Sequence, residues 1–185
     1  MHHTPLAVAG GRGGGANYSS AAVVHNTPPT ISSIWAAPGR YTVKLTANGQ
    51  SYTQPLTLKL DPRVKTPALG LAQQFTLSKQ LYDGIIEAQQ TVGDIRARLA
   101  VASNDPARSS EVAALQALEG QAAGRGAAAD GPDTFNSVIG AMNQLRGLLQ
   151  GADVTPTTQL TAAVAGRRAA VANLKARWNA LKAAK

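Results

Sequence analysis

The segment PGRYTVKLTANGQSYTQPLTLKLD, residues 38–61, predicts a β-hairpin and is the most informative stretch of the chain. From Tyr41 to Ala47 apolar residues alternate with polar ones, the period of two that places apolar side chains on one face of a strand. Asn48-Gly49 follows at once, and this dipeptide favours the positive φ angles of a type I′ turn. A two-residue loop pairs Ala47 with Gln50 and thereby fixes the register of both strands.

This register gathers the apolar side chains of both strands on one face of the hairpin. Pro55 has no backbone N–H, so the second strand should lie at a sheet edge or be irregular there. A one-sided sheet of this kind needs other groups to cover its apolar face. The facing pairs are Leu45 with Tyr52, Tyr41 with Leu56, and Val43 with the polar Gln54.

The β-region resembles only part of a domain. Residues 1–20 are rich in glycine and predict a flexible lead, and Ala21–His25 is a candidate short strand. About four short strands precede residue 61, whereas an immunoglobulin-like sandwich has about seven. We therefore expect a partial sandwich over 21–64, with its hairpin at 40–60, and with free edges and an uncovered face. The expected association surface consists of Trp35, Tyr41, Val43, Leu45, Tyr52 and Leu56.

Trp35 allows two interpretations. An exposed indole can stack against a sugar ring, whereas a lone tryptophan before a hairpin usually fills a small sandwich core. We favour the core position.

From Leu71 onward the apolar period becomes helical. Apolar residues recur at steps of three and four, which predicts amphipathic helices. Thr155-Pro156 predicts an N-cap followed by the first helical position. The expected fold class is α+β, a partial immunoglobulin-like sandwich followed by an antiparallel four-helix bundle over 65–185. The expected helices, of which the first and last are longest, cover about 71–103, 108–122, 134–150 and 156–184.

Composition limits the function classes. The 185 residues contain no cysteine, which excludes disulfides, thiolate metal sites and a cysteine nucleophile. The net charge of +8 is spread evenly, because residues 1–64 and 65–185 each contribute +4. A nucleic-acid binder usually concentrates its charge beside aromatic residues, so nucleic acid is not the expected partner. The first 15 residues lack the basic start and apolar run of a signal peptide, and no segment approaches the length of a membrane span, so we expect neither feature. The chain would then be either cytoplasmic or the downstream part of a longer secreted protein.

Candidate catalytic groups are few. Asp83 and Glu87 share a helix face and Asp94 follows seven residues later, but no histidine joins them in a di-metal pattern. Lys79 precedes Asp83 by four residues and should pair with it. His2, His3 and His25 have no metal-ligand spacing. We therefore expect these carboxylates to lie on a solvated face, and we expect no catalytic site, metal, cofactor or small-molecule substrate.

The last predicted helix is basic. Residues 156–185 contain six Lys and Arg and no Asp or Glu. Nucleic acid or an anionic membrane is therefore an alternative ligand, and Arg96 and Arg98 would extend the patch if the first and last helices are neighbours. The candidate anion-binding face consists of Arg167, Arg168, Lys175 and Arg177.

Several segments resemble the C-terminal part of large bacterial sortilin-like proteins with BNR (Asp-box) repeat β-propellers, which are often labelled glycosyl hydrolases. The resemblance covers about residues 21–185 and is most specific from Pro38 to Val64. The segments are HNTPP, SIWAAPGRYTVKLTANGQSYTQPLTLKLDPRVKTP, QQFTLSKQLYD, TPTTQL and LKARWNAL. This chain departs from the family pattern because it contains no Asp-box and no propeller.

The resemblance implies a non-catalytic C-terminal accessory module that serves domain packing or protein association. It implies an exported protein, periplasmic or extracellular, and a partner that is either the remainder of a propeller-containing parent or another copy of the chain. Two alternatives stay open. The fourth helix would bind nucleic acid or anionic membrane, or the chain would hydrolyse glycosides, which rests on the family label alone.

Overall fold

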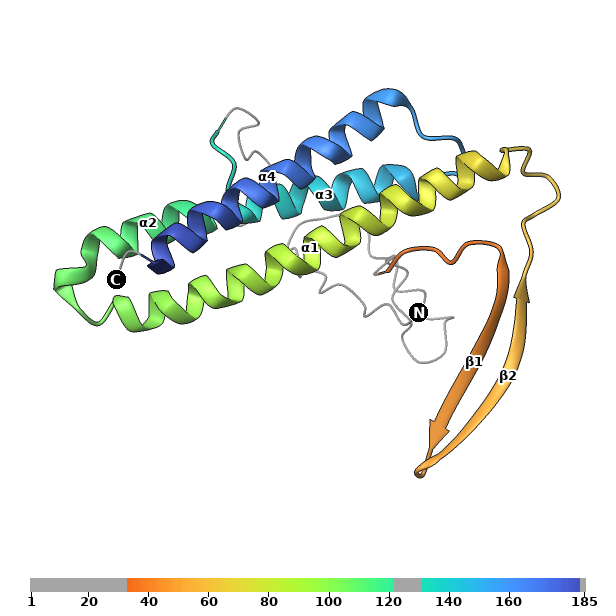
Figure 1. Cartoon of the computed structure of the whole chain (residues 1–185), viewed down its shortest axis with the longest axis horizontal. Coiled ribbons are helices and arrows are strands. Elements are labelled where there is room, and N and C mark those ends of the chain that lie inside the picture. Colours follow the sequence, from red (N-terminus) through yellow and green to blue (C-terminus); the bar gives the residue numbers. More distant parts are fainter. Residues whose placement is uncertain (1–32, 122–130, 184–185) are drawn as a thin grey trace, which may run out of the picture.

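A computed structural model describes residues 33–121 and 131–183 of the chain (Figure 1). These residues form an α+β structure with one antiparallel hairpin and four α-helices. The strands are β1 (Gly39–Ala47) and β2 (Gln50–Leu58), and a 3-10 turn (Pro106–Arg108) precedes α2. The helices are α1 (Ala68–Ala102), α2 (Ser109–Glu119), α3 (Phe135–Leu149) and α4 (Thr158–Ala183).

The predicted hairpin and its register are confirmed. Ala47 pairs with Gln50, and the pairing continues without a bulge to Gly39 and Leu58. The loop residues Asn48 and Gly49 have φ angles of 51° and 77°, as a type I′ turn requires.

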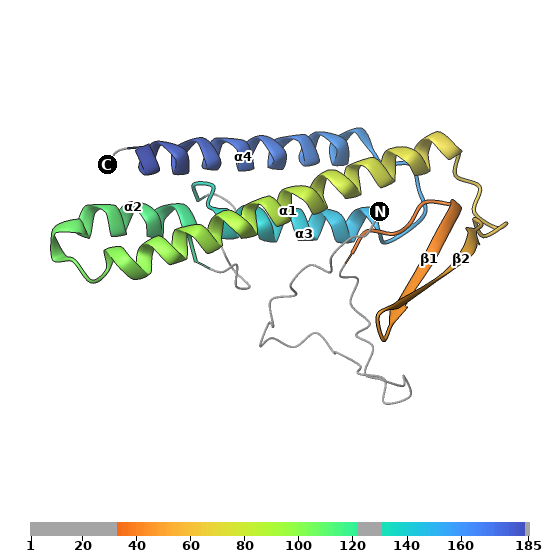
Figure 2. The same cartoon turned by 60° about the horizontal axis from the view of Figure 1, so that its bottom comes forward.

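The rest of the expected sandwich is not seen in residues 33–121 and 131–183, whose single sheet has two strands. The candidate strand Ala21–His25 and the glycine-rich lead 1–20 lie outside the described residues. The hairpin projects away from the helices in both views (Figures 1 and 2), and every residue from 40 to 57 is exposed. The two strands therefore stand apart from the helical core instead of forming a layer over it.

The helical region is organised around α1, which at 35 residues is about 52 Å long at 1.5 Å per residue. It contacts α2, α3 and α4. Figures 1 and 2 show α2 and α3 following one another along α1, both running opposite to it, while α4 runs in the same direction as α1. The Asn136 side chain donates a hydrogen bond of 2.8 Å to the carbonyl of Gly120, which joins the end of α2 to the start of α3.

This arrangement differs from the antiparallel four-helix bundle expected from the sequence, in which all four helices would lie side by side. Because α2 and α3 lie end to end, α1 and α4 enclose α2 at one end of the molecule and α3 at the other. The sequence did predict that the first and last helices are the longest. Their length allows the two shorter helices, α2 and α3, to pack one after the other along them.

The core lies between the helices and includes one residue from before the hairpin. Ile34 is 7% exposed and belongs to the same apolar cluster as the helical residues. On α1 the buried face is wider than a single stripe, since Leu77 and Leu81 are buried together with their neighbours Ser78 and Tyr82. Contacts with helices on two sides explain this width. The largest fully buried side chains are Phe135, Leu81, Ile85, Ile95, Leu115, Leu118, Met142 and Leu174.

Helix starts follow local capping chemistry. The hydroxyl of Thr134 accepts a hydrogen bond from the backbone N–H of Ser137, whose own hydroxyl accepts one from the N–H of Thr134, a capping box at the start of α3. At α4 the Thr157 hydroxyl accepts from the N–H of Leu160 at 3.2 Å. The predicted start at Thr155-Pro156 is therefore wrong, and a threonine two residues later fills that role.

Candidate association surface

One side of the hairpin is an apolar surface open to solvent. We call it the apolar hairpin face, and its five large side chains are 37–61% exposed, whereas the side chains of the helical core are less than a tenth exposed. The sheet pairing places them together, as the sequence predicted. The face consists of Tyr41, Val43, Leu45, Tyr52 and Leu56.

The two tyrosines of this face bond within or next to the hairpin. The Tyr41 hydroxyl donates to the carbonyl of Ala37 at 2.5 Å, and the Tyr52 hydroxyl donates to the side-chain oxygen of Gln50 at 2.6 Å. With their hydroxyls occupied, the rings present mainly apolar surface to solvent.

Short segments on either side of the strands attach the hairpin to the helices. The carbonyl of Ser33 accepts a hydrogen bond from the Arg146 guanidinium at 3.3 Å, next to the buried Ile34. After β2, the Thr66 hydroxyl donates to the carbonyl of Asp153 at 2.5 Å, in the segment between α3 and α4. Within the linker between β2 and α1, the Arg63 side chain pairs with Asp61 at 2.7 Å, and its hydrogen bonds lower the pKa of the Asp61 carboxyl. The sequence did not predict the anchoring by Ile34, because it favours the larger apolar neighbour Trp35 as the buried residue.

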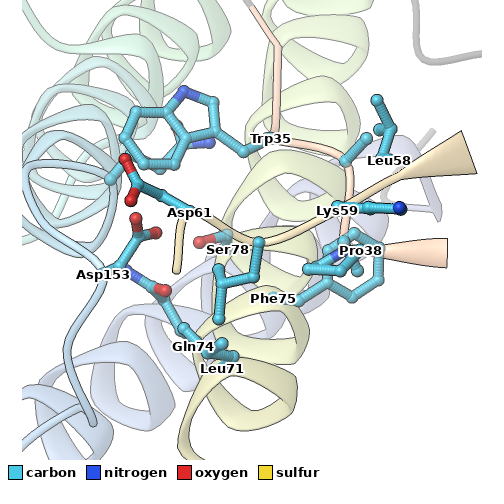
Figure 3. A pocket seen from close by; sticks show the side chains of 14 residues that line it. Trp35, Pro38, Leu58, Lys59, Asp61, Leu71, Gln74, Phe75, Ser78 and Asp153 are labelled. Carbon is cyan, nitrogen blue, oxygen red and sulfur yellow. The ribbon is translucent and has the colours of Figure 1, made fainter. Parts of the chain in front are cut away.

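Trp35 lies at the root of the hairpin and does not fill a sandwich core. Its side chain is 44% exposed and lines a cavity of about 260 Å³ between the ends of the strands and the first turns of α1. Figure 3 shows its indole beside the carboxylates of Asp61 and Asp153. The side chain of Gln74 also lines this cavity and donates hydrogen bonds to the carbonyls of Leu149 and Ala152.

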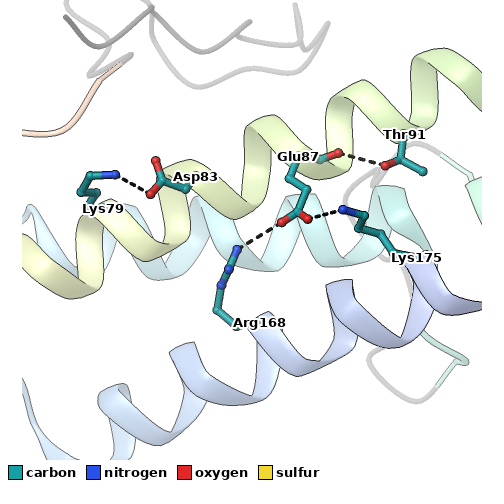
Figure 4. Close-up of polar contacts among 6 residues, drawn as sticks. All are labelled: Lys79, Asp83, Glu87, Thr91, Arg168 and Lys175. Carbon is teal, nitrogen blue, oxygen red and sulfur yellow. Dashed lines mark hydrogen bonds and ion pairs between the residues drawn. The ribbon is translucent and has the colours of Figure 1, made fainter. Parts of the chain in front are cut away.

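The candidate anion-binding face on α4 is largely occupied by ion pairs. Glu87 of α1 contacts Lys175 and lies 3.5 Å from Arg168 (Figure 4), and Arg167 lies 3.1 Å from Asp133. Among residues 33–121 and 131–183, Arg177 is exposed and has no acidic partner. The sequence could place these four cations on one helix, but it could not show that Glu87 and Asp133 would come to meet them.

Arg96 and Arg98 likewise have acidic partners on α2. Arg96 lies 2.6 Å from Glu119, and Arg98 binds Glu111 while its guanidinium sits 5.9 Å from the ring centre of Trp178. They join α1 to α2 rather than extending a free basic patch.

Glu111 has a low pKa, which makes part of the stability pH-dependent. Its carboxylate accepts hydrogen bonds from Arg108 and Arg98, in that order of effect, and they lower its pKa. The stabilisation is complete above the pKa of about 4.3 that a glutamate has in an unfolded chain, and it is lost as the pH falls through the lower folded value. The melting temperature of the wild type should therefore fall more steeply below about pH 5 than that of Glu111→Gln.

Thermal melting followed by circular dichroism between about pH 6 and 3 checks this prediction. Asp94→Asn is the matched control, because it removes the same charge from an exposed side chain that makes no ion pair with the described residues. Parallel profiles for the wild type and Glu111→Gln would show that the two arginines do not stabilise the carboxylate.

Of the three candidate carboxylates on α1, Asp83 and Glu87 have basic neighbours, whereas Asp94 is exposed and makes no ion pair with the described residues. Lys79 pairs with Asp83 at 2.5 Å, as predicted, and Glu87 pairs with α4 (Figure 4). Within the described part of the chain, no group of three His, Cys, Asp or Glu side chains is placed to hold a metal ion. Among the same residues, no helix combines the length and apolar character that a membrane crossing requires.

A comparison of the chain with known protein families, curated proteins and solved structures finds no match. The resemblance to sortilin-like proteins therefore rests on the quoted segments alone.

Proposed function

We propose that this chain is a non-catalytic module that associates with another protein through the apolar hairpin face. The observation that supports it is the exposure of five large apolar side chains on a hairpin that projects from the helices. Contiguous apolar patches on soluble proteins mark interaction sites more often than they occur without a role. The separate helical core supplies stability, so the hairpin is available for a partner.

We further propose that the partner belongs to the same kind of assembly that the sequence resemblance implies. In a sortilin-like parent, the apolar hairpin face would pack against the rest of an immunoglobulin-like sandwich or against a propeller. The helices would then form the α-helical region that follows this sandwich. A second copy of the chain is the other candidate partner for the same face.

The two alternatives have less support. A nucleic-acid or anionic-membrane surface on α4 would need free cations, but Arg167, Arg168 and Lys175 contact Asp133 and Glu87. Glycoside hydrolysis by Asp83 and Glu87 would need both carboxylates free to face a sugar, and both are ion-paired.

The double variant Leu45→Thr with Tyr52→Thr tests the association proposal, because these residues face each other and are the most exposed of the five. The wild type should either bind a hydrophobic fluorescent dye as a monomer or self-associate with rising concentration. The variant should lose about half or more of that signal, since it removes the centre of the patch. Dye titration and sedimentation velocity provide the two measurements.

Thr46→Ala with Ser51→Ala is the matched control, because this facing pair lies on the opposite side of the same hairpin. The control should behave as the wild type. A wild-type chain that neither binds dye nor associates would overturn the proposal, and so would equal signals from both double variants.

A further inference from the structure

We propose that the outer edge of β1 is a strand-addition site, which takes an extended segment of a partner carrying acidic side chains on one face. This inference rests on the proposed association function and names how the partner binds. It comes from the register of the hairpin, the position of its proline and the sign of its charges.

The register determines which backbone groups are free. In a two-residue hairpin the residues that flank the loop form a hydrogen-bonded pair, and such pairs alternate with non-hydrogen-bonded ones along the strands. Ala47 and Gln50 flank the loop, so residues at even numbers in β1 direct their N–H and C=O groups away from β2. These outward residues are Arg40, Thr42, Lys44 and Thr46.

The two edges of the hairpin are not equivalent. On β2 the outward positions include Pro55, which has no N–H to donate, so a strand added there would lose a hydrogen bond near its centre. The β1 edge has a donor and an acceptor at each of its outward positions. Every β1 residue after Gly39 is exposed, and among the described residues no other strand pairs with this edge. The proline protects one edge and leaves the other free for pairing.

The charges on the hairpin select an acidic strand. Arg40 and Lys44 lie on the same face, and residues 39–59 contain no Asp or Glu. An antiparallel strand with acidic residues four positions apart would place one opposite each cation, and opposite charges on facing residues stabilise a sheet. Its alternate residues would extend the apolar hairpin face beside Tyr41, Val43 and Leu45.

The same charges disfavour two of the symmetric registers in which β1 could pair with β1 of a second copy. A symmetric pair centred on Thr42 places Arg40 of each copy opposite Lys44 of the other, and one centred on Lys44 places the two lysines face to face. Like charges at facing positions destabilise a sheet. Residues 39–59 contain no Asp or Glu, so no register of two β1 strands gains the opposite-charge pairs that an acidic strand supplies. The edge therefore favours a different chain, while the apolar hairpin face alone would accept either partner.

The experiment titrates the whole chain into a labelled nine-residue peptide that alternates valine with polar residues, with capped ends and glutamate at its third and seventh positions. A peptide with lysine at those two positions is the charge control. We expect saturable binding of the glutamate peptide, measured by fluorescence anisotropy, at chain concentrations up to about 1 mM. Binding of the lysine peptide should be at least about tenfold weaker, because two favourable pairs become repulsive.

Two proline variants test which edge is used. Thr42→Pro removes an outward donor from β1, whereas Thr53→Pro removes one from the edge that Pro55 already interrupts. Neither position donates within the hairpin in this register. Thr42→Pro should weaken peptide binding about tenfold or more, and Thr53→Pro should change it less than about twofold.

A charge-reversed variant keeps the test decisive if a proline substitution distorts the hairpin. Arg40→Glu with Lys44→Glu should exchange the preference, so that the lysine peptide binds more tightly than the glutamate peptide. Absence of saturable binding, equal effects of the two prolines in folded variants, or an unchanged preference would each overturn the inference. So would self-association that Thr42→Pro abolishes, which would assign the edge to a second copy.

Failure of this inference is distinguishable from failure of the association proposal. If the peptide does not bind but Leu45→Thr with Tyr52→Thr still removes dye binding or association, only strand addition is wrong. If that variant has no effect, the apolar hairpin face is not the association surface.

Discussion

Phe135→Ala should lower the free energy of unfolding by about 3–5 kcal/mol, the usual cost of removing a large aromatic side chain from a core. Phe135 has no exposed surface and is among the largest fully buried side chains of the described chain. It also begins α3, so its loss affects the point where α3 meets α2. Urea denaturation followed by circular dichroism at the helix signal gives the measurement.

Leu148→Ala is the matched control on the same helix. Leu148 is 68% exposed, so this variant should change the stability by no more than about 0.5 kcal/mol. A loss below about 1 kcal/mol for Phe135→Ala would mean that the core does not include the start of α3.

Gly120→Ala should destabilise the chain by about 2–4 kcal/mol, because it combines backbone strain with a steric clash. Gly120 has φ 70° and ψ 169°, a conformation that almost only glycine adopts. A Cβ atom there would lie 2.2 Å from the hydroxyl oxygen of Thr134 and 2.4 Å from its Cβ. The substitution would therefore force apart the ends of α2 and α3.

Gly147→Ala is the control, because no atom would lie within 4 Å of the added Cβ atom and the residue is inside α3. It should stabilise the chain by about 0.5–1 kcal/mol, since alanine favours the helix. Equal melting temperatures for Gly120→Ala and the wild type would argue against the end-to-end contact of α2 with α3.

The hairpin could be predicted almost residue by residue because its structure is determined by residues close together in the sequence. Asn48-Gly49 determines the loop, the loop determines the register, and the register determines which side chains share a face. The existence and type of the helices follow from apolar periodicity in the same way. Start positions were less accurate, since Thr155 and Thr157 are equally good caps by residue type.

The arrangement of the helices could not be predicted because it depends on contacts between distant segments. The expected antiparallel bundle requires the chain to reverse between α2 and α3, yet α3 continues in the direction of α2 (Figures 1 and 2). The wide buried face of α1 has the same origin, since it buries Leu77 beside Ser78 and Leu81 beside Tyr82, adjacent residues that a single stripe does not bury together.

The candidate site was predicted in part. The membership of the apolar hairpin face followed from the register, whereas the place of Trp35 at the hairpin root depends on how the strands join the helices. The pairing of Lys79 with Asp83 was predictable from their spacing on one helix. The contacts of Glu87 with Arg168 and Lys175 join residues far apart in the chain, and nothing in either local sequence indicates them.

The most direct test of the account is hydroxyl-radical footprinting of the isolated chain at low concentration, read out by mass spectrometry at three tyrosines. Tyr52 and Tyr41 are 56% and 37% exposed on the apolar hairpin face, while Tyr82 is 3% exposed in the helical core and serves as the internal control. Tyr52 and Tyr41 should oxidise rapidly, whereas Tyr82 should be protected. Protection of Tyr52 equal to that of Tyr82 would contradict this expectation, because the apolar hairpin face would then already be covered.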